Sequence, residues 1–188
     1  EEELGFKPYP VHRLDKDTSG CVLLARSPRA ASRFAPLFEE KARGVLKAYG
    51  AVVGGGMERD SGVIEADVRV RGVAKGALTR WRLAEGFGNF SLREVELGTG
   101  RMHQIRLHLA SIGHPIVADD RHGDFARNKA WAAEYGARRL MLWAARLELP
   151  VDPPIKVSAP IPPHAAAFLE RLRNREAPPA GLKTGDPA

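Results

Sequence analysis

The chain has 188 residues, of which 44% are hydrophobic and 28% are charged. This balance predicts one globular domain, or one domain with a tail, and argues against a disordered, collagen-like or coiled-coil chain. Because no apolar run approaches the roughly 18 residues of a membrane span, we expect no membrane partner. The formal net charge of +6 favours a polyanionic partner such as nucleic acid, although a basic domain can also bind nothing anionic.

Cys21 is the single cysteine of the sequence. It excludes an internal disulfide and a cysteine-based zinc site. A chain without disulfides is typical of a reducing compartment, so we expect a cytoplasmic protein.

The first half of the chain alternates apolar runs with glycine-rich or charged turns. Ser27 and Pro28 predict the start of a helix, which we expect to run towards Arg43 with a break near Pro36. Alternation and β-branched residues predict strands at residues 21–26, 45–53, 62–70, 77–83 and 90–97. Short turns between the later strands favour an antiparallel meander.

The second half is richer in helices. We expect helices at residues 101–112, 128–136 and 163–173, and one more strand at 139–149. On the first of these helices, Met102, Ile105, Leu109 and Ile112 form one apolar stripe. The residues therefore predict a single domain of helices and mainly antiparallel strands.

Two clusters could carry chemistry, and the first is HRLDKDTSG at residues 12–20. Taken alone it predicts a polar turn in which Asp15 or Asp17 accepts backbone N–H groups. The density of polar side chains just before a buried strand favours a functional loop instead.

The second cluster is GTGRMHQIRLH at residues 98–108. A glycine-rich entry into a helix exposes N–H groups that suit a phosphate, and Arg101 and His103 lie on the first turn. Arg106 lies beside the apolar stripe, so it is either partly buried against a carboxylate or part of an exposed basic face. His103 and His108 are five residues apart, so they do not share a helical face as zinc-binding histidines do. We expect His108 on the helix surface.

Both clusters resemble the signatures of the RluA-type pseudouridine synthases. HRLDKDTSG at 12–20 and GTGRMHQIRLHLASIGHPIVADDRHGD at 98–124 occur in the order that the family has. Between them, KAYGAVV at 47–53 resembles the tyrosine-bearing strand of the family, and ALTR at 77–80 and RLMLWA at 139–144 resemble two further segments. The DDRHGD stretch is similar to the RluC-like branch, which modifies large-subunit ribosomal RNA.

The resemblance covers residues 8–173 and implies the α+β pseudouridine synthase fold, with a mixed, mostly antiparallel sheet flanked by helices. We expect one catalytic domain over residues 1–174, lacking its N-terminal strands, and a flexible tail at 175–188. Two positions depart from the family. His122 stands where most members have tyrosine, and Trp143 stands where most have histidine.

The resemblance also implies an activity, the conversion of uridine to pseudouridine in RNA. The N1–C1′ bond breaks and C5 bonds to C1′ without redox change, so neither a cofactor nor a metal is expected. Asp15 is then the catalytic carboxylate, ionised to act as nucleophile or base, and Arg106 favours that charge and fixes its orientation. Tyr49 borders the base and assists proton removal from C5. Attack on the sugar and a glycal route both remain open.

Further residues are expected to hold the RNA. Since a duplex hides the reacting atoms, the uridine has to be flipped out. By resemblance, Arg13 fills the space that the base leaves and Leu142 supplies an apolar wall. The helix entry adds Arg101, His103 and Gln104 as substrate-binding residues.

Residues 69–82 contain five cations and no acidic residue, which predicts a basic hairpin. We expect Arg71 and Arg80 to bind the RNA backbone there. The alternative is an ordinary solvated face.

The expected function is an RNA pseudouridine synthase, acting as a monomer in the cytoplasm on structured RNA, most of all on large-subunit ribosomal RNA. The alternatives are a non-catalytic RNA-binding module and an enzyme directed to tRNA. A metal-dependent deaminase is disfavoured because the chain lacks the necessary cysteine ligands.

Overall fold

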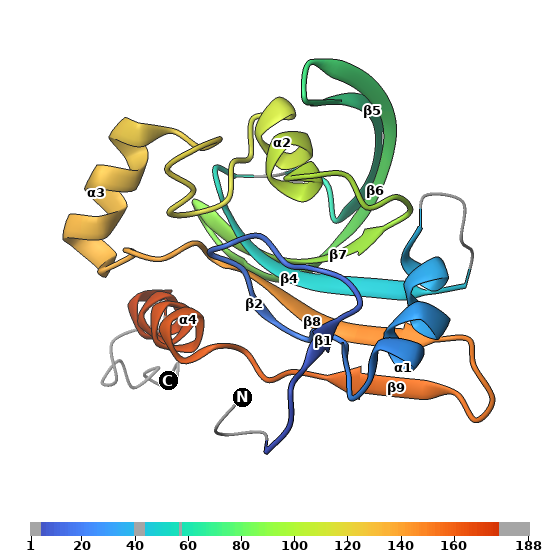
Figure 1. The fold of residues 1–188 in the computed structure, drawn as a ribbon. Coiled ribbons are helices and arrows are strands. Elements are labelled where there is room, and N and C mark those ends of the chain that lie inside the picture. The colour runs from blue at the N-terminus through green and yellow to red at the C-terminus, as the bar shows by residue number, and fades with distance from the viewer. Residues whose placement is uncertain (1–4, 40–43, 57, 177–188) are drawn as a thin grey trace, which may run out of the picture.

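The computed structural model describes residues 5–39, 44–56 and 58–176, and one large sheet dominates it (Figure 1). The strand order is β2-β8-β4-β7-β6-β5, and β9 pairs with a further part of β8. All neighbours are antiparallel except β2 and β8. The strands are β2 (Ser19–Gly20), β4 (Leu46–Gly54), β5 (Ser61–Val70), β6 (Val73–Phe87), β7 (Phe90–Leu97), β8 (Leu142–Leu149) and β9 (Ile155–Ser158). The predicted fold class, a mixed and mostly antiparallel sheet with helices, is confirmed.

The remaining elements surround this sheet. A two-stranded ribbon, β1 (Tyr9–Pro10) with β3 (Leu24–Ala25), brackets the loop that leads into β2. The helices are α1 (Pro28–Phe34), the short 3-10 helix η1 (Ala35–Phe38), α2 (Gln104–Ser111), α3 (Phe125–Tyr135) and α4 (Pro163–Glu176). None of the helices in the described ranges is long and apolar enough to cross a membrane.

The two faces of the sheet have different partners. Tyr49, Val95 and Trp81 lie side by side on β4, β7 and β6, and α2 covers this face through hydrogen bonds to the neighbouring Thr79. We call it the cleft face. The opposite face carries Phe90, which packs edge-on against Phe168 of α4, with ring centroids 5.4 Å apart. Figure 1 shows α2 and α4 on the two sides of the sheet.

Close packing on the opposite face depends on two glycines. A Cβ at Gly50 would collide with the Trp143 ring, and one at Gly54 would collide with the ring of Trp131 on α3. Trp143 is 3% exposed and lies on this face, opposite Gly50 in the β4–β8 pair. The departure from the family at Trp143 therefore fills the core, away from the cleft face.

Several element boundaries differ from the sequence-based expectations. The helix expected from residue 101 begins only at Gln104, because His103 has a left-handed backbone with φ 55°. The stripe on it is only half buried: Ile105 and Leu109 are inside, whereas Met102 is 49% and Ile112 38% exposed.

The other boundaries move by a few residues. The strand expected at 21–26 is reduced to β3. Before it, the Cys21 N–H donates to the Ala144 carbonyl of β8 and the Leu23 N–H donates to His12. The helix expected at 128–136 begins at Phe125, where the Asp124 side chain accepts from the Arg127 N–H as N-cap. The last helix continues through Glu176, past the start of the expected tail at 175, and residues 177–188 lie outside the described part. The expected helical segment at 40–43 also lies outside it.

Candidate active site

Asp15 lies in the loop between β1 and β2, and this loop is fixed at both ends. The Thr18 N–H donates to the Asp15 carbonyl at 3.0 Å, which closes a tight turn. Gly20 follows with φ 109°, and a Cβ there would collide with the backbone of Ala144 on β8. A glycine is therefore required where the loop joins the sheet.

His12 fixes the other end of the loop. Its Nε2 accepts the Leu23 N–H at 3.0 Å, and its ring stacks on Phe38 at a centroid distance of 4.3 Å and an interplanar angle of 8°. Burial lowers the pKa of His12, helped by the nearby Lys47, so the ring stays neutral and can accept this hydrogen bond. Because the loop is fixed at both ends, the position of the Asp15 carboxylate is fixed as well.

A cleft of about 600 Å³ opens beside this loop, large enough for a nucleoside. Its lining includes Asp15, Tyr49, Arg106 and Leu142, which come from four separate parts of the chain. The three residues predicted as catalytic are therefore brought together, with Leu142 as an apolar side of the same cleft.

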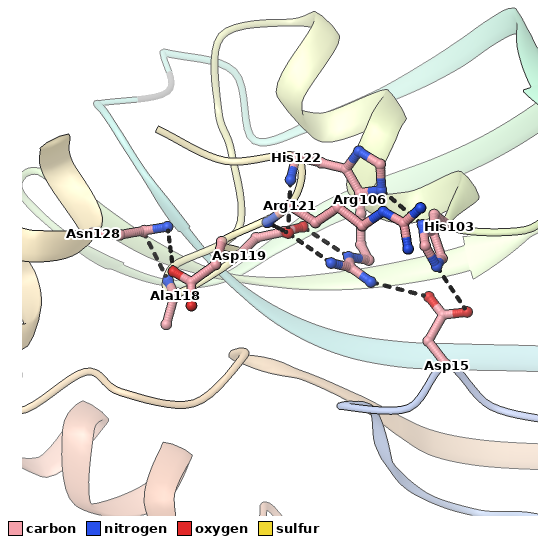
Figure 2. Close-up of polar contacts among 9 residues, drawn as sticks. Asp15, His103, Arg106, Ala118, Asp119, Arg121, His122 and Asn128 are labelled. Carbon is pink, nitrogen blue, oxygen red and sulfur yellow. Dashed lines mark hydrogen bonds and ion pairs between the residues drawn. The ribbon is translucent and has the colours of Figure 1, made fainter. Parts of the chain in front are cut away.

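Arg106 lies between two carboxylates (Figure 2). Its Nε and Nη2 donate to the two oxygens of Asp119 at 2.8 and 2.7 Å, and its Nη1 lies 3.6 Å from Oδ2 of Asp15. The hydrogen bonds to Asp119 raise the pKa of Arg106, although burial opposes them. Of the two alternatives for Arg106, the structure shows the one in which it is buried against a carboxylate. Its tight partner is Asp119, and Asp15 lies only within ion-pair range.

Sequence reasoning did not single out Asp119 as a site residue. It is 1% exposed and also accepts the N–H groups of Arg121 at 3.1 Å and His122 at 2.9 Å. Burial alone would raise the pKa of Asp119, but the hydrogen bonds from Arg106 and the backbone lower it below its ordinary value. The available signal was a pair of acids, ADD at 118–120, that follows an arginine already expected to need a carboxylate.

The loop that carries Asp119 is held by α3. Asn128 accepts the Ala118 N–H through its side-chain oxygen at 3.0 Å, and Ala118 has a left-handed φ of 58°. Gly123 donates its N–H to the Asp119 carbonyl at 2.8 Å, and a Cβ at Gly123 would collide with that same oxygen. The acid that orients Arg106 is itself rigidly placed.

His103 completes the group around Asp15. Its Nε2 lies 3.8 Å from Oδ1 of Asp15, and its Nδ1 makes a 2.7 Å hydrogen bond with Nε2 of His122. Burial lowers the pKa of His103, opposed by Asp15 and reinforced by Arg106 and Arg121. The other departure from the family, His122, is thus part of the site.

Tyr49 lies at the same cleft, on β4. Burial, with a contribution from the negative charge of Asp15, raises the pKa of Tyr49 to about 12. The phenol is therefore neutral at physiological pH.

Three other predicted residues line the cleft in different ways. Arg13 is exposed at its edge, and the Arg101 Nε donates to the Gly76 carbonyl at 3.2 Å. Gln104 is 2% exposed, and its amide bonds Leu78, Thr79, Thr99 and Arg101 at 2.7 to 3.0 Å. These four contacts use the full hydrogen-bonding capacity of the Gln104 amide, so it positions the helix entry and has none left for a substrate.

The predicted basic hairpin does not form a basic surface. Arg80 points to the opposite face of the sheet, since it follows Thr79 and lies across from Glu96 in the β6–β7 pair. Glu65 and Asp67 on β5 share that face by alternation, so the charges are mixed. Arg80 is therefore directed away from the cleft, and its expected contact with the RNA backbone stays a prediction. The count of charges along residues 69–82 missed these acidic residues, because they lie on neighbouring strands of the sheet.

Arg71 also lies apart from the cleft. It forms the two-residue turn of the β5–β6 hairpin with Gly72, and both have positive φ, 50° and 83°. It does not belong to the cleft lining. The prediction for His108 was wrong as well: it is 2% exposed, with Nδ1 2.9 Å from the Thr79 hydroxyl and Nε2 3.2 Å from the Ala66 carbonyl.

A second cavity of about 420 Å³ adjoins the site on the other side of Arg106 and His103, which line both. Four exposed cations contribute to its wall, together with the carboxylates of Asp17 and Asp120. The cations are Lys16, Arg121, Arg138 and Arg139. These four cations lie beside the Asp15 loop, and none of them was predicted from the sequence to bind RNA.

No cluster of three or more potential metal ligands occurs among the residues that the structure describes. Within the site, the positive charge of Arg106 faces the negative charges of Asp119 and Asp15. The geometry defines a carboxylate, within ion-pair range of an arginine and bordered by a neutral tyrosine, in a cleft of nucleoside size.

The comparison with known families agrees with this site. The family model described as RNA pseudouridylate synthase matches residues 1–111, which include Asp15, Tyr49 and Arg106. The chain belongs to this family, as the resemblance to RluA-type enzymes predicted.

Particular relatives were found by sequence. The ribosomal large subunit pseudouridine synthase C of Vibrio cholerae is 37% identical over 87% of this chain and 55% of the relative. The tRNA pseudouridine synthase C of Salmonella typhi is 35% identical over 79% of this chain and 65% of the relative. The chain thus spans about 55 to 65% of the length of these two curated relatives.

Solved structures show the same fold. The human RNA pseudouridylate synthase domain containing 4 superposes with a TM-score of 0.76 at 26% identity, covering 88% of this chain and 76% of that one. The human domain containing 1 gives a TM-score of 0.72 at 26% identity, covering 97% and 83%.

Proposed function

We propose that this chain isomerises uridine to pseudouridine in structured RNA. The observation that carries the proposal is the Asp15 carboxylate, which enters a cleft of about 600 Å³ between Arg106 and Tyr49. Membership of the RNA pseudouridylate synthase family supports the same reaction. A non-catalytic binding module would not need a carboxylate placed in this way.

The reaction needs little beyond these groups. The N1–C1′ bond breaks, C5 forms a bond to C1′, the C5 proton is removed, and N1 gains a proton, so the atoms and electrons balance within one nucleotide. An ionised Asp15 serves either as the nucleophile at C1′ or as the base. Arg106 lies 3.6 Å from it, which stabilises the carboxylate and leaves it room to turn towards the substrate.

Tyr49 acts as a neutral group in this scheme. With a pKa of about 12, only a fraction on the order of 10⁻⁵ is phenolate at pH 7, so the ring packs against the base and its hydroxyl hydrogen-bonds. Asp15 is the stronger candidate for removing the C5 proton. Leu142 provides apolar contact for the uracil.

The RNA backbone is proposed to pass over the second cavity. Lys16, Arg121, Arg138 and Arg139 provide the positive charge there, next to the loop that holds Asp15. We assign to Arg13, which is exposed and lines the cleft, the filling of the gap left by a flipped base. This path replaces the one expected over Arg80.

Large-subunit ribosomal RNA is the proposed substrate, and a cytoplasmic monomer is the proposed form of the protein. The relative with 37% identity is named as a ribosomal enzyme, which favours this substrate. tRNA is the second candidate, because a relative with 35% identity is named for it.

The test is a map of pseudouridines in cellular RNA, made with the gene, without it, and with a copy encoding Asp15→Asn. We expect one or more large-subunit positions to lose the modification in the second and third cells. Loss confined to tRNA would transfer the proposal to tRNA. An unchanged map in all three would overturn the proposed activity.

A further inference from the structure

We propose that His122 is a positioning residue that fixes the tautomer of His103, so that the Nε2–H of His103 points at the Asp15 carboxylate. The pair then acts as a second anchor for Asp15, beside Arg106. The proposed tautomer does not depend on the activity of the protein, whereas its effect on catalysis rests on the proposed function.

The two anchors hold different oxygens of Asp15. Arg106 approaches Oδ2 at 3.6 Å, and His103 approaches Oδ1 through Nε2 at 3.8 Å (Figure 2). A carboxylate held at one oxygen can rotate about its χ2 torsion, but one held at both has a defined plane. Both contacts are slightly longer than hydrogen bonds, which is common in catalytic sites before the substrate binds.

The tautomer follows from the partners of each ring nitrogen. The 2.7 Å contact between Nδ1 of His103 and Nε2 of His122 requires one donor and one acceptor. An ionised Asp15 can only accept, so the favourable neutral form of His103 carries its proton on Nε2. Its Nδ1 is then the acceptor, and His122 must donate from its own Nε2–H.

The neutral form of His103 agrees with its surroundings. Its charged neighbours are Arg106 and Arg121, which disfavour an imidazolium, and Asp15 and Asp119, which favour one. Burial adds to the arginines, and the pKa of His103 lies below its ordinary value. Burial also lowers the pKa of His122, so both rings are neutral at physiological pH.

The placement of both rings is controlled by Asp119 and by the backbone. The His122 N–H donates to Oδ1 of Asp119 at 2.9 Å, and Arg106 donates to both oxygens of the same carboxylate. His103 has a φ of 55°, an unusual conformation for a residue with a Cβ, and its side chain is 13% exposed. Two routes therefore lead from Asp119 to Asp15, one through Arg106 and one through His122 and His103.

The direct test is imidazole NMR of the ¹⁵N-histidine-labelled chain at pH 7.5, which needs no RNA. We expect His103 to show a protonated Nε2 and an unprotonated Nδ1, with the resonance assigned by its loss in His103→Gln. The opposite tautomer in the wild type would overturn the proposal, even if the protein proves to be an active pseudouridine synthase.

Two variants of His122 distinguish its role as a hydrogen-bond donor from the effect of its size. His122→Gln keeps an N–H donor at a similar reach, whereas His122→Phe keeps an aromatic ring without a donor. We expect His103 to keep its tautomer in His122→Gln and to become a mixture of both tautomers in His122→Phe. If His122→Phe does not fold, the comparison of the wild type with His122→Gln still decides, since a changed tautomer in the glutamine variant contradicts the proposal.

The same variants test the consequence for turnover. On uridine-tritiated transcripts of large-subunit ribosomal RNA and of tRNA, His122→Phe should lower kcat about tenfold or more with KM changed less than about twofold, since a misplaced catalytic group costs rate before affinity. His122→Gln should restore most of the rate. Equal rates in the wild type and a folded His122→Phe would overturn the anchoring role. Absence of turnover in the wild type would count against the proposed function, and the NMR result would then decide the tautomer alone.

Discussion

Arg106 donates two hydrogen bonds to Asp119, at 2.8 and 2.7 Å, and only approaches Asp15, at 3.6 Å. The orientation of the guanidinium is therefore set by an acid outside the lining of the cleft. A buried bidentate pair is rigid, so Arg106 presents a fixed positive charge to the loop that carries Asp15. Asp15 keeps a looser contact, which suits its proposed role as a carboxylate that changes partners during the reaction.

The first prediction concerns that buried pair. Asp119→Ala leaves the Arg106 side chain, 6% exposed, without its partner, so we expect a loss of about 3–5 kcal/mol in the free energy of unfolding. Urea denaturation of the wild type and the variant measures it. Glu94→Ala, which breaks the exposed pair with Arg82, is the matched control and should cost no more than about 1 kcal/mol. Equal losses in the two variants would contradict a structural role for Asp119.

The same carboxylate predicts an acid sensitivity. Because the pKa of Asp119 is lower in the folded chain than in the unfolded one, its contribution is complete above about pH 4 and is lost as the pH falls through the lowered value. Asp119→Asn should therefore show a smaller loss of stability between pH 5 and pH 2 than the wild type. Parallel acid denaturation curves would contradict this linkage.

The second prediction tests Asp15. Asp15→Asn keeps the size of the side chain and removes its charge, so tritium release from uridine-tritiated RNA should fall below detection. RNA affinity should change less than about threefold, because phosphate contacts dominate it. Asp67→Asn, an exposed change on the opposite face of the sheet, is the control and should keep full turnover. Normal turnover by Asp15→Asn would remove Asp15 from the mechanism.

Much of this site was predictable because short motifs fix local geometry. HRLDKDTSG at 12–20 places Asp15 in a tight turn before a strand, and KAYGAVV at 47–53 places Tyr49 on a central strand. Both predictions use contacts within a few residues. The resemblance to a family then supplied the roles.

The failures have one physical cause, which is that charge and burial depend on neighbours far away in sequence. The run that holds Arg80 contains no acidic residue in the sequence, but Glu96 on the next strand lies across from Arg80 in the sheet. His108 was predicted to be exposed, but in the structure it contacts Thr79 of β6 and Ala66 of β5. Asp119 lies 13 residues after Arg106, and it reaches the guanidinium because the loop after α2 turns back.

The third prediction locates the RNA backbone. Arg121→Ala combined with Arg139→Ala removes two cations from the second cavity, so affinity for RNA should fall and the salt slope should become shallower by about 1.4–1.8, for two phosphate contacts. RNA that is bound should still be converted. The matched control is Arg80→Ala, an exposed arginine on the opposite face of the sheet, which should leave the slope unchanged. Filter binding at several salt concentrations measures both. A larger effect from Arg80 would restore the hairpin as the binding surface.

The last prediction uses the pKa of Tyr49 to test whether its side chain lies near Asp15. An unfolded tyrosine ionises near pH 10, whereas burial and the charge of Asp15 raise the pKa of Tyr49 to about 12. Between these values the folded chain holds a proton that the unfolded chain has lost, so the stability due to Tyr49 is complete below pH 10 and falls as the pH rises. The difference in absorbance at 295 nm between the wild type and Tyr49→Phe should accordingly show a midpoint near 12. Because burial is the larger cause, Asp15→Asn should shift that midpoint downwards while leaving it above 10. A midpoint that does not respond to Asp15→Asn would mean that the two side chains do not share the cleft.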